Sequence, residues 1–200
     1  MKNIFKRRRV TKGTNDSDPL NKRLREILAD LRRDGSVSYD NDAVYSAGLN
    51  IVDRPKLEPL VPELARPLYQ QVVDAGIGYD AVTSCPRGGN AWAEALIAHA
   101  KTDGRDVPFY KLNKVSTGTF SVIDGQPVKR GAKLLLADDT IFRGITSSAA
   151  VKVLESAGFK IAGLVFPVEI GLQGRRHWDK KGYPVFSIYN NSFIGALPKS

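Results

Sequence analysis

The chain has very little cysteine: Cys85 is the only one among 200 residues. A lone cysteine excludes an internal disulfide and any metal centre built on several thiolates. Long apolar runs are also missing, because the longest, at 161–166, has the length of a buried strand and is too short to cross a bilayer. The basic residues at the start precede no apolar segment, so we expect no secretory signal, no membrane association and a cytoplasmic location.

Acidic residues are absent from the first fifteen positions, and this absence concentrates the positive charge there. The net charge is +9, and six basic residues precede the first acid, Asp16: Lys2, Lys6, Arg7, Arg8, Arg9 and Lys12. Such a segment is either a solvated terminus or an arm that contacts nucleic acid, and the sequence leaves both interpretations open. We predict a basic disordered tail at 1–16 and a single domain at 17–200.

The composition, 42% hydrophobic and 26% charged, is typical of a globular protein with a substantial core. A helix is predicted from Ser17 or Asp18 to Gly35, and a hairpin or loop at 40–50. Apolar strands then alternate with helical patterns, which predicts an α/β fold with a parallel sheet covered on both faces. The predicted strands are 79–84, 107–110, 133–137, 160–168 and 183–188, and the helices run from 59 or 62 to 75, over 90–101 and over 147–156. In the second of these helices, Ala91, Ala95, Leu96 and Ala98 are expected to face the core.

The most informative stretch lies at 134–148, where an apolar strand ends in two adjacent carboxylates, Asp138 and Asp139. A loop with Gly144 and several hydroxyl residues follows, and then a helical pattern begins. Because the strand aims the carboxylates at the ligand edge of a parallel sheet, they can accept hydrogen bonds from vicinal sugar hydroxyls. The free N–H groups at the helix start can bind a phosphate. The alternative is that one acid caps the helix and the other is simply solvated.

A second loop, 85–89, joins a predicted strand to a predicted helix and contains Arg87, Gly88 and Gly89. Paired glycines let the backbone approach an anion closely, and an arginine adds a bidentate positive group. The same residues also suit a tight strand-to-helix turn, where glycine is needed on steric grounds alone. Taken alone, this loop therefore supports either a binding site or a turn.

A third segment, 111–125, is long and polar, and contains Lys111, Lys114 and two glycines, Gly118 and Gly125. A mobile loop with lysines at this spacing can neutralise a departing anion, and its glycines can act as hinges. The alternative is an ordinary polar β-hairpin.

Taken together and in this order, the segments resemble the type I phosphoribosyltransferases, and orotate phosphoribosyltransferase most of all. The 134–148 stretch is similar to the family's signature for phosphoribosyl pyrophosphate (PRPP). Lys111, Lys114 and Gly118, followed by Ile-Asp-Gly at 123–125, are similar to the family's lysine loop, and the segments 171–175 and 182–187 are similar to its C-terminal part. The resemblance covers roughly residues 18 to 193. It implies a type I phosphoribosyltransferase-like fold: a central, mainly parallel sheet flanked by helices, with a small hood or N-terminal subregion.

The resemblance also implies an activity: a nucleobase, orotate or a related base, joins PRPP to give a nucleoside 5′-monophosphate and pyrophosphate, as in pyrimidine biosynthesis. Mg²⁺ is the implied cofactor, bound near Asp138 and Asp139 indirectly, through substrate or water, and a homodimer is the implied assembly. The implied catalytic residues are Asp138, Asp139, Lys111 and Lys114. The implied substrate-binding residues are Arg87, Gly88, Gly89, Thr140, Arg143, Gly144, Ile145, Thr146, Ser147 and Arg175.

The sequence departs from the family pattern at specific positions. Large side chains replace small residues in the 134–148 stretch, at Phe142, Arg143 and Ile145, and they suit a phosphate site only where they point outward. Gly171 stands where the family's arginine would bind the orotate carboxylate, and Arg175 or Arg176 is a candidate replacement. A base without a carboxylate therefore suits the site better. The rival hypothesis is a phosphoribosyltransferase-like protein that has lost its chemistry and serves as a regulator or binds nucleic acid.

Overall fold

The computed structural model describes residues 58–116, 118–169 and 173–189, the backbone of two short strands near the start of the chain, and the helical residues 19, 22, 23 and 26. The predicted basic tail at 1–16 lies outside the described residues. Within the described part, no helix is long and apolar enough to cross a membrane.

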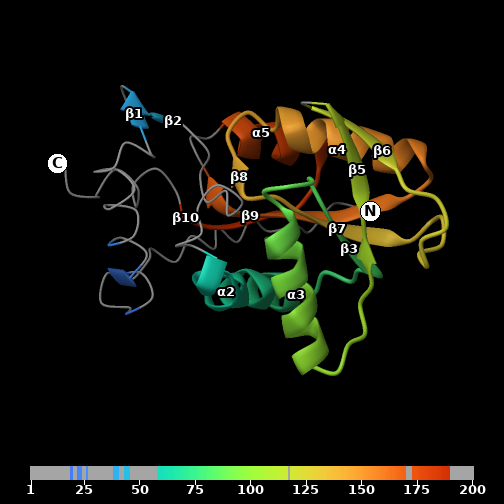
Figure 1. Ribbon diagram of the computed structural model, residues 1–200, viewed down its shortest axis with the longest axis horizontal. Coiled ribbons are helices and arrows are strands. Elements are labelled where there is room, and N and C mark those ends of the chain that lie inside the picture. The colour runs from blue at the N-terminus through green and yellow to red at the C-terminus, as the bar shows by residue number, and fades with distance from the viewer. Residues whose placement is uncertain are drawn as a thin grey trace, which may run out of the picture.

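The elements alternate along the chain as the sequence predicts (Figure 1). The order of the elements is β1 (Ser38–Asp40), β2 (Ala43–Tyr45), the 3-10 helix η2 (Glu58–Leu60), α2 (Val61–Asp74), β3 (Ala81–Ser84), α3 (Asn90–Thr102), β4 (Phe109–Tyr110), β5 (Leu112–Ser116), β6 (Thr119–Val122), β7 (Lys133–Ala137), β8 (Thr140–Ile141), α4 (Ile145–Ser156), β9 (Lys160–Glu169), α5 (Gln173–Lys181) and β10 (Val185–Tyr189). Near the start, β1 and β2 form an antiparallel pair.

The central sheet has the strand order β10-β9-β7-β3-β4, and every neighbouring pair is parallel. The short strand β8 pairs with the far end of β9, beyond the end of β7. This arrangement confirms the predicted parallel sheet. It also brings the carboxyl ends of β7, β3 and β9 to one edge, where ligands of open α/β sheets bind.

Two hydrophobic cores lie on opposite faces of the sheet, because successive side chains of a strand point to opposite sides. In β7, Leu135 and Ala137 belong to the core beneath α2 and α3. Leu134 and Leu136 belong to the core beneath α4 and α5. Figure 1 shows the two pairs of helices on the two sides of the strands. Since both faces are covered, β7 is continuously apolar after its exposed first residue, Lys133, rather than alternating.

The predicted bounds of α3 are confirmed to within one residue, but the prediction is wrong for one of its four core residues. Ala98 is exposed, whereas Trp92 is fully buried and fills the core in its place. Ala95 and Leu96 are buried as expected, and Ala91 is partly buried. The large indole determines which face of this alanine-rich helix packs inward, because alanines alone define only a weak apolar stripe.

Three local features differ from the sequence expectation or go beyond it. The segment 112–122 is an antiparallel hairpin, so the hairpin alternative is confirmed for β5 and β6, with Gly118 in the left-handed region at φ 69°. Helix α4 begins at Ile145, two residues before its predicted start. Helix α5 was not among the predicted helices, because its sequence QGRRHWDKK is strongly polar and buries only Gly174 and Trp178.

Candidate active site

The two carboxylates lie at the carboxyl end of β7, as predicted. Asp138 continues the strand pairing, since its amide donates to the carbonyl of Val165 in β9 at 3.0 Å. The amide of Asp139 donates to Oδ1 of Asp138, also at 3.0 Å. Asp138 is buried, with 7% of its surface exposed, and Asp139 is partly exposed. One carboxylate is therefore held inside the edge of the sheet, and the other lies nearer to solvent.

The glycine loop after β3 packs directly against this acid pair. A Cβ atom on Gly88 would lie 2.3 Å from Oδ2 of Asp139, and a Cβ on Gly89 would lie 2.5 Å from the carbonyl oxygen of Ala137. The amide of Cys85 donates to that same carbonyl at 3.0 Å. At Gly89 the neighbouring atoms are backbone oxygens and leave no room for a side chain, and at Gly88 a side chain would displace the carboxylate of Asp139. The structure therefore brings the second loop and the 134–148 stretch into one site.

Arg87, in the same loop, has a φ of 83° and is the only residue other than glycine with a positive φ among those the structure describes. A left-handed conformation at a residue of this size costs about 1–3 kcal/mol and is typical of functional sites. The Arg87 side chain is exposed. The loop therefore combines a strained backbone with a positive group free to approach an anion.

Burial and neighbouring charge raise the pKa values of Asp138 and of the adjacent Cys85. The pKa of Asp138 is raised well above its usual range, first by burial and then by the neighbouring negative charge of Asp139, although a hydrogen bond with Cys85 opposes the rise. Burial, followed by the charge of Asp138, also raises the pKa of the Cys85 thiol. A carboxyl group whose pKa lies above its ordinary value can take up and release a proton closer to neutrality.

The loop 140–148 leads from the acids to the start of α4. Gly144 precedes the helix with a φ of 75°, and no side chain caps the helix. The amide of Ser148 already donates to the carbonyl of Gly144 at 2.9 Å, whereas the amides of 145–147 precede the first intrahelical bonds. The side chain of Ile145 is 67% exposed and so lies outside this backbone cradle. The helix start therefore presents N–H groups to an anion despite the large side chains nearby.

Arg143 and Phe142 lie beside each other in this loop. The guanidinium of Arg143 lies 5.1 Å from the centroid of the Phe142 ring, and its side chain is exposed. Phe142 is partly buried and packs against the core beneath α2 and α3. Thr140, at the start of the loop, has a buried Oγ1 without a hydrogen-bond partner among the described residues. Buried hydroxyl groups usually have a hydrogen-bond partner, so this one is an exception next to the acid pair.

Helix α5 packs against the 140–148 loop and the start of α4, and the sequence did not predict these contacts. The indole N–H of Trp178 donates to Oγ of Ser147 at 3.2 Å, and Nε2 of His177 lies 2.8 Å from Oγ of Ser148. The amide of Gly174 donates to the carbonyl of Phe142 at 2.7 Å. The side chain of Ser147, which we expected at the substrate, is buried in these contacts, so only its amide remains for an anion.

The predicted lysines belong to the hairpin region. The backbone of Lys111 is fixed by Gln126, which accepts from its amide at 2.6 Å and donates to its carbonyl at 2.8 Å. Its ammonium group lies 5.6 Å from the centroid of the Phe109 ring. The positive charge of Lys114 acts on Cys85, which lies next to Asp138, and lowers the pKa of that thiol slightly against the larger effect of burial. Lys114 therefore acts electrostatically on the thiol that neighbours Asp138.

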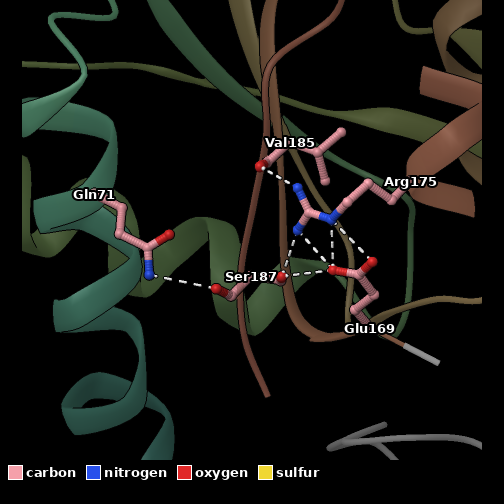
Figure 2. Close-up of polar contacts among 5 residues, drawn as sticks. All are labelled: Gln71, Glu169, Arg175, Val185 and Ser187. Carbon is pink, nitrogen blue, oxygen red and sulfur yellow. Dashed lines mark hydrogen bonds and ion pairs between the residues drawn. The ribbon is translucent and has the colours of Figure 1, made fainter. Parts of the chain in front are cut away.

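Arg175 occupies a different environment from the one expected of a substrate-binding residue (Figure 2). Its Nε donates to both oxygens of the buried Glu169, at 2.9 and 2.7 Å. Its Nη1 donates to the carbonyl of Val185 at 3.1 Å, and its Nη2 donates to Oγ of Ser187 at 2.7 Å. All three guanidinium nitrogens therefore have partners within the protein, which corrects the expectation that Arg175 is free to bind a carboxylate on the base.

Comparisons with known proteins agree with this geometry. The family model described as the phosphoribosyl transferase domain matches residues 48–198. Orotate phosphoribosyltransferase of Pyrococcus furiosus is 28% identical over 138 residues, which are 69% of this chain and 72% of that protein. Adenine phosphoribosyltransferase of Desulfitobacterium hafniense is 33% identical over 67 residues, which span only 33% of this chain and 38% of that relative.

The fold is also similar to that of a solved structure, Mycobacterium tuberculosis orotate phosphoribosyltransferase in complex with PRPP. The TM-score is 0.61 at 19% identity, over 87% of this chain and 92% of that chain. At so low an identity the similarity concerns the fold alone. The family model, in contrast, matches the sequence over most of the chain. The chain therefore belongs to the type I phosphoribosyltransferase family.

Proposed function

We propose that the protein transfers the phosphoribosyl group of PRPP to a nucleobase, orotate or a related base, with release of pyrophosphate. The observation that carries this proposal is the approach of Gly88 to the carboxylate of Asp139, which joins an anion-binding loop to the acid pair at one sheet edge. In the reaction, the bond from C1′ to a pyrophosphate oxygen breaks, and pyrophosphate leaves with the electron pair. A base nitrogen bonds to C1′ and gives up its proton.

The acid pair is assigned to the ribose. Asp139 is the more accessible carboxylate, and in this proposal it accepts hydrogen bonds from the two ribose hydroxyls together with Asp138. Because positive charge develops on the ribose as the pyrophosphate leaves, nearby carboxylates stabilise the transition state electrostatically. The raised pKa of Asp138 also suits it to accept the proton from the base.

The start of α4 is assigned to the 5′-phosphate. The backbone amides of Ile145, Thr146 and Ser147 supply donors there, and the left-handed Gly144 allows the close approach. The unpaired hydroxyl of Thr140 and the exposed guanidinium of Arg143 are further groups on this loop that suit a phosphate. Mainly the backbone would bind the phosphate, so the large side chains are compatible with this role.

The pyrophosphate is assigned to the glycine loop and the hairpin. The amide of Gly89 already donates to the carbonyl of Cys85 at 3.1 Å. The backbone of Gly88 lies beside the carboxylate of Asp139, Arg87 precedes it with an exposed guanidinium, and Lys111 and Lys114 would add positive charge from the hairpin. These residues neutralise the leaving group rather than attack the substrate, so the protein acts by orientation and electrostatics.

Mg²⁺ fits this site as a cofactor held largely by the substrate. The described residues contain no cluster of three or more ligating side chains, and a pair of carboxylates suits Mg²⁺ that keeps its waters and binds substrate oxygens. Asp138 and Asp139 would hold it indirectly, and when bound it supplies charge neutralisation at the pyrophosphate.

A panel assay tests the proposal. The purified protein is incubated with Mg²⁺, PRPP and, in turn, orotate, uracil, adenine, xanthine and hypoxanthine, and pyrophosphate release is measured. We expect release with at least one base and loss of release when Asp139 is replaced by Asn in a protein that still folds. The absence of release with every base, together with salt-sensitive binding of nucleic acid, would favour the rival hypothesis of a nucleic-acid-binding protein. Sedimentation would test the proposed homodimer.

A further inference from the structure

We propose that Arg175, with Glu169 and Ser187, is a positioning residue that holds α5 against the 140–148 loop and does not itself contact substrate. This inference deepens the proposed function and rests on it, because the loop is the one assigned to the 5′-phosphate. Its basis is a network of buried contacts that joins three elements at the carboxyl edge of the sheet (Figure 2).

The network is closed around the buried carboxylate of Glu169, whose side chain is 5% exposed. Arg175 contacts it through Nε and through Nη2, the latter at 2.6 Å. The hydroxyl of Ser187 accepts from Arg175 and donates to Glu169 at 2.9 Å, so it links the two charged groups. Gln71 of α2 donates to the carbonyl of Ser187 at 3.3 Å and extends the network to the other side of the sheet.

Glu169 connects this network to the 140–148 loop through its backbone. It is the last residue of β9 and lies opposite Ile141 in the register of β8 and β9. Gly174, immediately before Arg175, packs on the same residue, because a Cβ on Gly174 would lie 2.4 Å from Cγ1 of Ile141. The ion pair therefore fixes the first turn of α5 at the point where the helix meets the loop.

The next residues of α5 contact the start of α4. His177 and Trp178, two and three residues after Arg175, contact Ser148 and Ser147, which lie in the first turn of α4. A displacement of α5 would consequently move the side chains that support the anion-binding amides. A misplaced binding group of this kind is sufficient to weaken binding substantially.

A direct substrate role is a poor alternative for Arg175. Four of its five N–H groups already donate within the protein: that of Nε to Glu169, one of Nη1 to Val185, and the two of Nη2 to Ser187 and Glu169. To bind a carboxylate on a base through two N–H groups, the guanidinium would have to give up at least one of these contacts, and loss of those to Glu169 would leave a buried carboxylate without its positive partner. Arg175 therefore acts on the substrate through the 140–148 loop.

The test compares Arg175→Met and Arg175→Lys with a matched control, Lys180→Met, which removes one exposed positive charge from the same helix. Hydrogen–deuterium exchange of peptides covering 140–148 is measured in the free protein, and the Kd for PRPP with Mg²⁺ is measured by calorimetry. We expect Arg175→Met to increase exchange in the loop and to raise the Kd about tenfold. Arg175→Lys should fall between it and the wild type, and Lys180→Met should change neither quantity.

Two results would overturn the inference. One is a folded Arg175→Met protein with unchanged loop exchange and unchanged PRPP affinity. The other is a variant that binds PRPP normally but has lost affinity for the base, which would make Arg175 a base-binding residue. If Arg175→Met does not fold, Ser187→Ala removes only one hydroxyl from the network and is measured in the same way. If the wild type itself fails to bind PRPP, the proposed function fails, while the exchange data still decide whether Arg175 positions the loop.

Discussion

Replacing Gly88 by alanine should separate the chemistry of the site from the stability of the fold. Gly88 has no positive φ, so alanine is compatible with its backbone conformation. The added methyl group would, however, lie 2.3 Å from Oδ2 and 2.7 Å from Cγ of Asp139. The carboxylate must therefore move, and it is the end of a side chain rather than fixed backbone.

The size of the effect follows from this overlap. An ordinary contact between such atoms is about 3.4 Å, so the carboxylate must shift by about 1 Å. A displacement of this size in a substrate-binding group costs roughly 100-fold in turnover, equivalent to about 2.7 kcal/mol in the activation free energy. The stability cost should be smaller, about 1 kcal/mol, which lowers the Tm by about 2–4 °C for a chain of this length.

Two further glycines supply the controls. A Cβ on Gly89 would lie 2.5 Å from the carbonyl oxygen of Ala137 and 2.7 Å from that of Cys85, and neither backbone oxygen can move freely. Gly89→Ala should therefore destabilise the fold by about 3 kcal/mol or more, seen as a Tm lower by about 6–12 °C. Gly78 has open space around its Cβ position and no positive φ, so Gly78→Ala should leave turnover unchanged.

Thermal unfolding followed by circular dichroism and pyrophosphate release from PRPP would be measured on all three variants. The reasoning is refuted if Gly88→Ala keeps wild-type turnover, because the carboxylate of Asp139 would then not need its present position. It is also refuted if Gly88→Ala and Gly89→Ala lose the same amount of stability, since the two contacts differ in how easily the neighbouring atom moves.

Three other changes give distinct expectations. Asp138→Asn should abolish turnover yet raise the Tm at pH 7. The pKa of Asp138 is higher in the folded than in the unfolded protein, so the stability of the wild type falls as the pH rises from about 4 through the folded-state pKa. The difference in Tm between the two proteins should therefore vanish at about pH 4. Lys114→Met should raise the KM for PRPP about tenfold by removing one charge-assisted contact with the leaving group, and an unchanged KM would remove this lysine from the site. Arg175→Met should lower the free energy of unfolding, measured with urea, by about 3–5 kcal/mol, because the carboxylate of Glu169 stays buried without its positive partner. Adding Glu169→Gln to the Arg175→Met protein should restore part of this loss.

Much of the fold could be predicted from the sequence because the strands and the helices on the sheet bury continuous or periodic apolar patterns. The strand at 133–137 was predicted with its exact bounds, and α3 to within one residue. The acid pair, Asp138 and Asp139, could be assigned to the carboxyl edge because an apolar strand immediately precedes it. Local patterns of this kind are sufficient when burial alone decides the structure.

Helix α5 and its network could not be predicted in this way. Its sequence is polar, and its position depends on two buried residues, Gly174 and Trp178, and on an ion pair between Arg175 and Glu169. No local pattern indicates that an arginine will meet a glutamate six residues earlier, across the end of a strand. The sequence consequently suggested a substrate role for Arg175, and the tertiary contacts assign it a structural one.

The sequence alone was sufficient for the alternation of the main strands and helices of the sheet, for the resemblance to the family and for the chemical groups at the sheet edge, because each follows from the pattern of neighbouring residues along the chain. Only the tertiary structure decided that Gly88 lies against Asp139, that the side chain of Ser147 faces Trp178 and that Arg175 is already paired. The physical reason is that these are contacts between different elements of the fold, whether far apart in the sequence, as for Gly88 and Asp139, or only six residues apart, as for Glu169 and Arg175. Their partners are selected by packing and by the need to pair buried polar groups, which no single segment specifies.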